Sequence, residues 1–150
     1  MSQEVVINTG NQASVNTDTT KVFVWQNRFR NATFVATNSG YDDVVHKAGT
    51  VLGRISASNK VTPLKSGASD NSQFPVGILA KDVTVPAGES VETTVSMCIA
   101  GDVNKNLIVL QGSDALTTVV SGKTILDRIG ADTVGVNVVE TTEMTSFDNQ

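Results

Sequence analysis

The chain has 150 residues, with 11 basic and 15 acidic side chains, a formal net charge of -4 and a sequence pI of about 4.8. This length allows one domain with a substantial core, and the acidic balance gives no general attraction to phosphate backbones or anionic lipid. Charged residues make up only 17% of the chain, so much of the polar surface comes from Thr, Ser and Asn, which suit strands and turns. We therefore expect a mainly β protein that binds neither nucleic acid nor membrane.

The first 20 residues form a distinct segment. A short apolar patch, Val5-Val6-Ile7, is followed by a run of Asn, Thr, Gln and Ser that cannot bury enough apolar surface to offset the entropy of ordering it. We interpret residues 1–20 as a flexible arm that can reach roughly 70 Å when extended. Neither a signal peptide nor a membrane helix of roughly 20 apolar residues is recognisable, so we expect synthesis in a reducing cytoplasm.

Strand patterns dominate from residue 22 onward. Runs of β-branched and aromatic residues, separated by Gly, Pro and Asn turns, predict strands over 22–25, 33–37, 49–56, 61–64, 76–79, 83–85 and 91–100. One short helix is predicted from a Ser121 cap to Gly130, with a weaker helical turn over 114–120, before a last strand over 134–139. The predicted organisation is an arm (1–20), one β-rich domain (21–140) and a polar tail (141–150).

Side chains for catalysis or metal binding are scarce. His46 is the only histidine, is predicted to be a surface or edge residue of a short strand, and has no Gly-x-Ser-x-Gly motif to accompany it. Cys98 is the only cysteine, so an intrachain disulfide is impossible and a packing role is expected. The Gly-Lys-Thr run at 122–124 resembles the end of a phosphate-binding loop, but Thr117 occupies the position of the first glycine. We predict no enzyme activity, no cofactor and no metal site.

One aromatic and basic cluster is formed by Trp25, Arg28, Phe29 and Arg30. Interleaved aromatic and arginine side chains can form a surface that binds nucleic acid, but in an acidic chain a contact with protein is the favoured interpretation. Trp and Arg are also the residue types that most often anchor protein interfaces. Trp25, Arg28 and Phe29 are therefore the interface candidates.

The middle of the chain carries a series of short motifs. Ala-Gly-Thr-Val-Leu-Gly at 48–53 is followed by Ser-Asp at 69–70, Val-Gly-Ile-Leu at 76–79 and Ala-Gly-Asp-Val at 100–103, with a predicted helix and strand behind them. In this order and spacing, roughly residues 41–140 resemble the head decoration proteins of lambda-like tailed phages. Asp102 stands where glutamate is common in that family. The resemblance implies a β-clip-like bent ribbon in a single compact domain, with one or two short helices.

Glycines recur within these motifs. Glycine inside a strand is destabilising, and it usually marks a bend, a bulge or a close approach of two backbones. A sharply bent β ribbon needs such points. We therefore expect four glycines to define the fold: Gly49, Gly53, Gly77 and Gly101.

The resemblance also implies a function. It implies a non-catalytic homotrimer at three-fold sites of the expanded capsid, bound to the major capsid protein on the outer surface of the virion. There it would stabilise the head against internal DNA pressure, after synthesis in the cytoplasm of the bacterial host. Val5, Val6 and Ile7 are the predicted capsid-binding residues, because a mobile β-prone segment can add as a strand to an exposed sheet edge.

Two other classes use similar strands. A carbohydrate-binding or adhesin module of a phage or cell surface would need an exposed aromatic platform, and glycan binding by the isolated protein would favour it. A carrier domain of the biotinyl or lipoyl type would need a lysine displayed on a tight hairpin. Lys65, in Leu-Lys-Ser-Gly, matches that requirement poorly, and the intact mass would reveal any prosthetic group.

Overall fold

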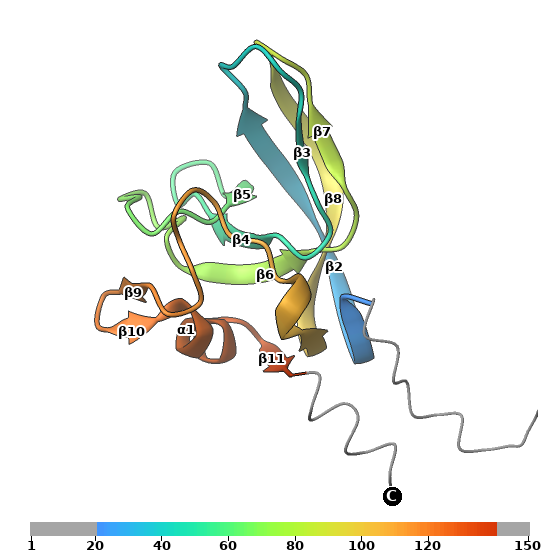
Figure 1. Ribbon diagram of the computed structural model, residues 1–150, viewed down its shortest axis with the longest axis vertical. Coiled ribbons are helices and arrows are strands. Elements are labelled where there is room, and N and C mark those ends of the chain that lie inside the picture. The colour runs from blue at the N-terminus through green and yellow to red at the C-terminus, as the bar shows by residue number, and fades with distance from the viewer. Residues whose placement is uncertain (1–20, 141–150) are drawn as a thin grey trace, which may run out of the picture.

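A computed structural model of the chain describes residues 21–140. Two strands of 15 residues each, β2 (Phe23–Thr37) and β8 (Ser90–Asn104), pair antiparallel and form the longest ribbon of the molecule (Figure 1). The strands predicted over 22–25 and 33–37 are therefore one strand. Most of the polar residues between them are exposed. Pairing with β8 includes them in one ladder, with register shifts around Gln26, although their own pattern carries no strand signal.

Shorter strands close a small barrel against this ribbon. β4 (Val51–Arg54), β5 (Val61–Pro63) and β6 (Pro75–Leu79) complete the strand order β11-β8-β2-β5-β4-β6, and β6 pairs back to β8. The last strand, β11 (Gly135–Val139), runs parallel to β8 along residues 100–104. The predicted mainly β, β-clip-like single domain is confirmed, with one α-helix. The predicted flexible arm lies outside the described residues.

Two apolar clusters fill the domain. Neighbouring residues Ile78 and Leu79 of β6 belong to different clusters, as strand alternation requires, so β6 separates the two. The cluster around Ile78 includes Ile125 and Ile129 of the helix α1 (Ile125–Asp132). These two side chains form the apolar side of the helix and are buried in this cluster. The second cluster is centred on Phe34, which is fully buried. The ribbon, the barrel and the helix are thus one packed unit.

The helical segment differs from its prediction. α1 begins after Thr124, whose hydroxyl caps it by accepting a hydrogen bond from the Asp127 N–H at 3.2 Å, and it continues past Gly130. Ser121 is not the cap: with φ of 50° at Ser121 and 87° at Gly122, these residues form the turn between β9 (Val119–Val120) and β10 (Lys123–Thr124). Positive φ at both central residues is characteristic of a two-residue type I′ hairpin turn. The weaker helical turn expected over 114–120 is also wrong, since those residues form turns and β9.

A separate two-stranded ribbon packs beside the upper half of β2 and β8 (Figure 1). It consists of β3 (Val44–His46) and β7 (Val83–Val85), and the His46 ring lies 5.7 Å from the Phe34 ring. The turn that leads into it is held by Asn38, whose amide donates to the carbonyls of Asp42 at 2.7 Å and Val85 at 3.0 Å. This turn presents Tyr41 fully exposed to solvent.

Three of the four glycines expected to define the fold lie where an added Cβ would collide with neighbouring backbone. A Cβ atom at Gly53 would be 1.9 Å from the Ser72 carbonyl oxygen. Gly101 has φ of 109°, and a Cβ there would be 2.7 Å from the Asn27 Cα, where the β2 ladder is bulged. These approaches require glycine for steric reasons. A Cβ at Gly49 would be 2.2 Å from the Leu107 carbonyl oxygen. At Gly77 the nearest atom is the Met97 sulfur, at 2.9 Å, in a side chain that can move.

Candidate interaction surfaces

The two longest stretches of open strand edge on the long ribbon, within residues 21–140, lie on β8 and on β2. From Ser90 to Val95, β8 pairs only with β2, because its pairing with β6 begins at Met97. From Phe23 to Asn31, β2 pairs only with β8, because β5 joins it at Phe34. Open strand edges expose backbone donors and acceptors, so they are the places where another segment can add to a sheet.

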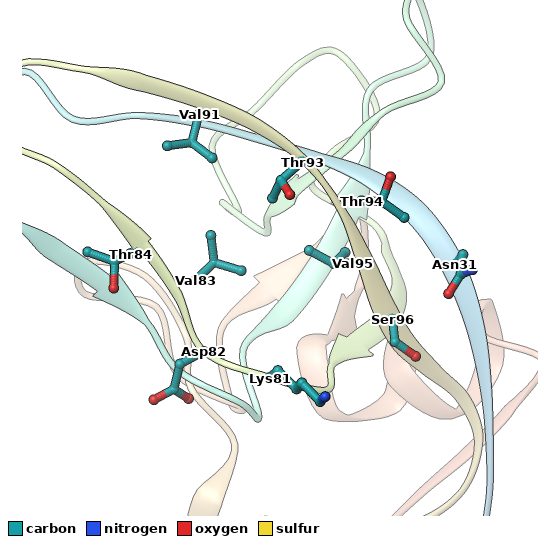
Figure 2. A pocket seen from close by; sticks show the side chains of 10 residues that line it. All are labelled: Asn31, Lys81, Asp82, Val83, Thr84, Val91, Thr93, Thr94, Val95 and Ser96. Carbon is teal, nitrogen blue, oxygen red and sulfur yellow. The ribbon is translucent and has the colours of Figure 1, made fainter.

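The first open edge borders a groove. The groove lies between β7 and β8 and has a volume of about 550 Å³. Figure 2 shows Val83, Val91 and Val95 directed into the space between the two strands. Polar side chains surround these valines, among them Lys81, Asp82, Thr84, Thr94, Ser96 and Asn31.

The second open edge carries all three interface candidates. Trp25 and Phe29 each expose 46% of their surface, and Arg28 between them is also exposed. The Phe29 ring meets the Phe23 ring edge to face, with 5.2 Å between the ring centres. The structure therefore brings Trp25, Arg28 and Phe29 together on one short stretch of β2, which we call the Trp25–Arg30 edge.

The predicted capsid-binding residues Val5, Val6 and Ile7 lie outside the described residues. The structure does show where their segment is attached. The Asn104 N–H donates to the Val22 carbonyl at 2.8 Å, and Val139, at the end of β11, is paired with Asn104. The two ends of the described chain therefore lie at the same end of the domain (Figure 1). The Tyr41 turn lies at the opposite end, beyond the last residue of β2.

Cys98 has the environment of a packing residue. Its side chain is fully buried, its thiol donates to the Ala100 carbonyl at 3.1 Å, and the Asn27 amide donates to the sulfur at 3.5 Å. Burial raises the pKa of the thiol, which keeps it protonated and unreactive. Among residues 21–140, no three His, Cys, Asp or Glu side chains gather as metal ligands. No helix in this part of the chain is long and apolar enough to span a membrane.

His46 makes the stability of the domain dependent on pH. Burial, and then the positive charge of Lys65, lower the pKa of His46 below its ordinary value of 6.5. The unfolded chain therefore binds the proton more tightly, so stability falls as the pH drops below about 6.5, until the pH passes the lowered pKa.

In the native chain, we expect the urea concentration at the unfolding midpoint to decrease as the pH is lowered from about 7.5 to about 5.5. The substitution His46→Gln should flatten this dependence, because no other histidine titrates in that interval. An equal loss of stability in both proteins would show that His46 does not cause it.

Comparison with known protein families identifies the family of the chain. A family model described as Bacteriophage lambda head decoration protein D matches residues 9–128, which is most of the chain. The chain belongs to the head decoration protein family. A search of curated proteins found no match. The match starts well before the motif series at 48–103, so it includes the whole of β2 and the Trp25–Arg30 edge.

Membership of this family gives the chain a role in capsid decoration and a place on the exterior of the phage head. The family is one of structural capsid proteins. Within this head decoration protein, sequence reasoning located the Trp25–Arg30 edge but missed the groove between β7 and β8. Its valines were each predicted to lie in strands, but the sequence carries no signal for which strand edges stay unpaired.

Proposed function

We propose that this head decoration protein binds the expanded phage head as a homotrimer at three-fold sites and stabilises the shell against the internal pressure of DNA. The observation that carries the proposal is the family match over residues 9–128. A ligand that binds only the expanded shell stabilises that state by mass action. Its partners are the major capsid protein and two further copies of this chain. The chain is synthesised in the cytoplasm of the bacterial host before it binds the head.

Val5, Val6 and Ile7 are the proposed capsid contact. Their segment is attached next to Asn104 and the end of β11, so we infer that this end of the domain faces the shell and the Tyr41 turn faces outward. An extended β-prone segment can add to an exposed sheet edge through backbone hydrogen bonds. One such contact is weak because ordering the segment opposes binding, but three segments on one trimer act at high effective concentration.

Replacing Val5, Val6 and Ile7 together with serine should abolish binding to undecorated expanded capsids, because serine removes the apolar, β-branched surface of the added strand. Co-sedimentation with purified expanded capsids measures this directly. The matched control is Asn11→Ser with Gln12→Ser, which alters the same segment without removing apolar groups and should bind normally. Deleting residues 1–20 should act like the triple variant.

Sedimentation of each free variant tests the trimer separately. The domain of residues 21–140 closes its own barrel and core, so both the triple variant and the deletion should remain folded trimers. Full capsid binding by the deletion variant would refute the proposed contact. A free protein that sediments as a monomer would refute the trimer. The exposed aromatic pair that the adhesin alternative would need is Trp25 with Phe29, and glycan binding by the isolated protein would favour that alternative.

A further inference from the structure

The Trp25–Arg30 edge is unsuited to simple strand addition. Its ladder with β8 shifts register between Phe23 and Phe29, and Gln26 has a left-handed backbone with φ of 49°. Bulges of this kind interrupt the regular spacing of backbone donors and acceptors that an added strand needs. A ligand of this edge must therefore be recognised mainly by its side chains.

Two arginines on this edge have no partner in the domain. The side chains of Arg28 and Arg30 are exposed, and neither makes a hydrogen bond or ion pair with any residue in 21–140. Arg54 and Arg128, by contrast, both donate hydrogen bonds to groups within the domain. A guanidinium group binds carboxylates in a bidentate manner, so this pair favours an acidic ligand.

The aromatic side chains beside these arginines favour a ligand that is also apolar. Trp25 and Phe29 remain about half exposed, at 46% each. Aromatic and arginine side chains together are typical of the centre of a protein contact, not of a solvated surface. The expected ligand is therefore a short peptide segment that carries both carboxylates and an aromatic or aliphatic side chain.

The C-terminal tail of this chain has that composition. Residues 141–150 read Thr-Thr-Glu-Met-Thr-Ser-Phe-Asp-Asn-Gln, with carboxylates at Glu143 and Asp148 and large apolar side chains at Met144 and Phe147. It has no basic residue. The tail therefore matches the edge in charge and in apolar content.

The tail is also long enough to reach the edge. It starts after Glu140, which an ion pair of 2.7 Å holds to Lys105 at the end of β8. β11 and β2 flank β8 on opposite sides, about 10 Å apart, and the pairing of Arg28 with Ala100 places it about 13 Å further along the ribbon. Residues 141–150 span up to about 35 Å when extended, roughly twice the direct distance to Arg28.

We propose that residues 141–150 dock on the Trp25–Arg30 edge of the same chain. The carboxylates of Glu143 and Asp148 bind Arg28 and Arg30, and Phe147 packs against Trp25. The tail then covers residues 25–30 of β2 in the free protein. This inference does not depend on the capsid contact proposed for Val5, Val6 and Ile7.

Trp25 is the only tryptophan, so its fluorescence reports on the edge alone. Removing residues 141–150 should shift the Trp25 emission to longer wavelength and increase its quenching by acrylamide. In the full chain, the paired substitution Glu143→Gln with Asp148→Asn should produce most of the same change. Salt at 1 M, where the Debye length is about 3 Å, should also weaken the protection of Trp25. Unchanged emission and quenching in the paired variant and in the truncated chain would overturn the proposal.

A charge exchange tests the pairing itself. Arg28→Glu with Arg30→Glu should expose Trp25, and adding Glu143→Arg with Asp148→Arg should restore its protection. The matched control is Arg54→Gln, which removes an arginine elsewhere on the domain and should leave the emission unchanged. Failure of the exchanged pairs to restore protection would contradict the assignment of these ion pairs.

A mixing experiment separates the same chain from a neighbouring copy. A chain lacking residues 141–150 is refolded with an excess of full-length chains that carry Trp25→Phe, so that only the truncated chain fluoresces. We expect its Trp25 to stay exposed. Protection in the mixture would assign the tail to a neighbouring subunit and overturn the proposal. All of these measurements use the free protein, so their failure is distinguishable from a failure of capsid binding.

Discussion

Replacing Gly53 by alanine should lower the free energy of unfolding by about 3 kcal/mol or more. Gly53 lies in β4 and is buried, and a Cβ there would be 1.9 Å from the carbonyl oxygen of Ser72 and 2.6 Å from its carbonyl carbon. Ser72 cannot retreat easily, because its N–H and hydroxyl both donate to the Asp70 carboxylate, at 3.0 and 2.5 Å. The strand must therefore move away from β6, with which Gly53 is paired.

Chemical denaturation followed by circular dichroism measures this loss. The matched control is Gly67→Ala: Gly67 is exposed, has no heavy atom within 4 Å of the added Cβ, and does not have a positive φ. Alanine there should leave stability unchanged or raise it by about 0.4–1 kcal/mol, through the lower entropy of the unfolded chain. Similar effects of the two substitutions would show that the contact with Ser72 does not constrain β4.

Replacing Phe34 by alanine should lower the free energy of unfolding by about 3–5 kcal/mol. Phe34 is fully buried at the point where three parts of the fold meet. It pairs with Thr93 in β8 and Val61 in β5, and its ring lies 5.7 Å from that of His46 in β3. The cavity left by the ring would remove contacts between the ribbon, the barrel and the β3–β7 ribbon together.

Tyr41→Ala is the corresponding control on an aromatic side chain. Tyr41 is fully exposed, so its removal should change the free energy of unfolding by less than about 0.5 kcal/mol. Both variants are compared at one protein concentration, because any oligomer makes the unfolding midpoint dependent on concentration. A small effect of Phe34→Ala would mean that the surrounding strands collapse into the cavity.

The placement of the two chain ends links the proposed contacts. Val22 and Val139 are both bound next to Asn104, so residues 1–20 and 141–150 leave the domain close together. The proposed capsid contact and the proposed tail contact therefore occupy the same end of the domain. Comparing capsid binding by the full chain and by the chain without residues 141–150 would show whether the two contacts influence each other.

The sequence by itself determined the fold class, most of the short strands and the family. Val-Gly-Ile-Leu at 76–79 and the Gly-bracketed run at 49–53 are local patterns, because alternation and turn residues act over a few positions. The single cysteine allowed a packing role to be predicted without coordinates, whereas the single histidine, expected at the surface or an edge, is partly buried beside Phe34. The cluster of Trp25, Arg28, Phe29 and Arg30 was recognised from its residue types, but its place on an open strand edge was not.

Only the tertiary structure decided how these pieces combine. The polar stretch over 27–31 carries no strand signal, but β8 supplies its hydrogen bonds and makes β2 continuous. The local sequence around Ser121 and Gly122 predicts the start of a helix, but the pairing of β9 with β10 places these two residues in a hairpin turn. The steric need for Gly53 comes from Ser72, in a separate loop. Strand pairing and close approach of backbones join residues that are far apart in the chain. Local propensity therefore decides which elements form. Long-range contacts decide the boundaries of these elements, their open edges and the surfaces available to a partner.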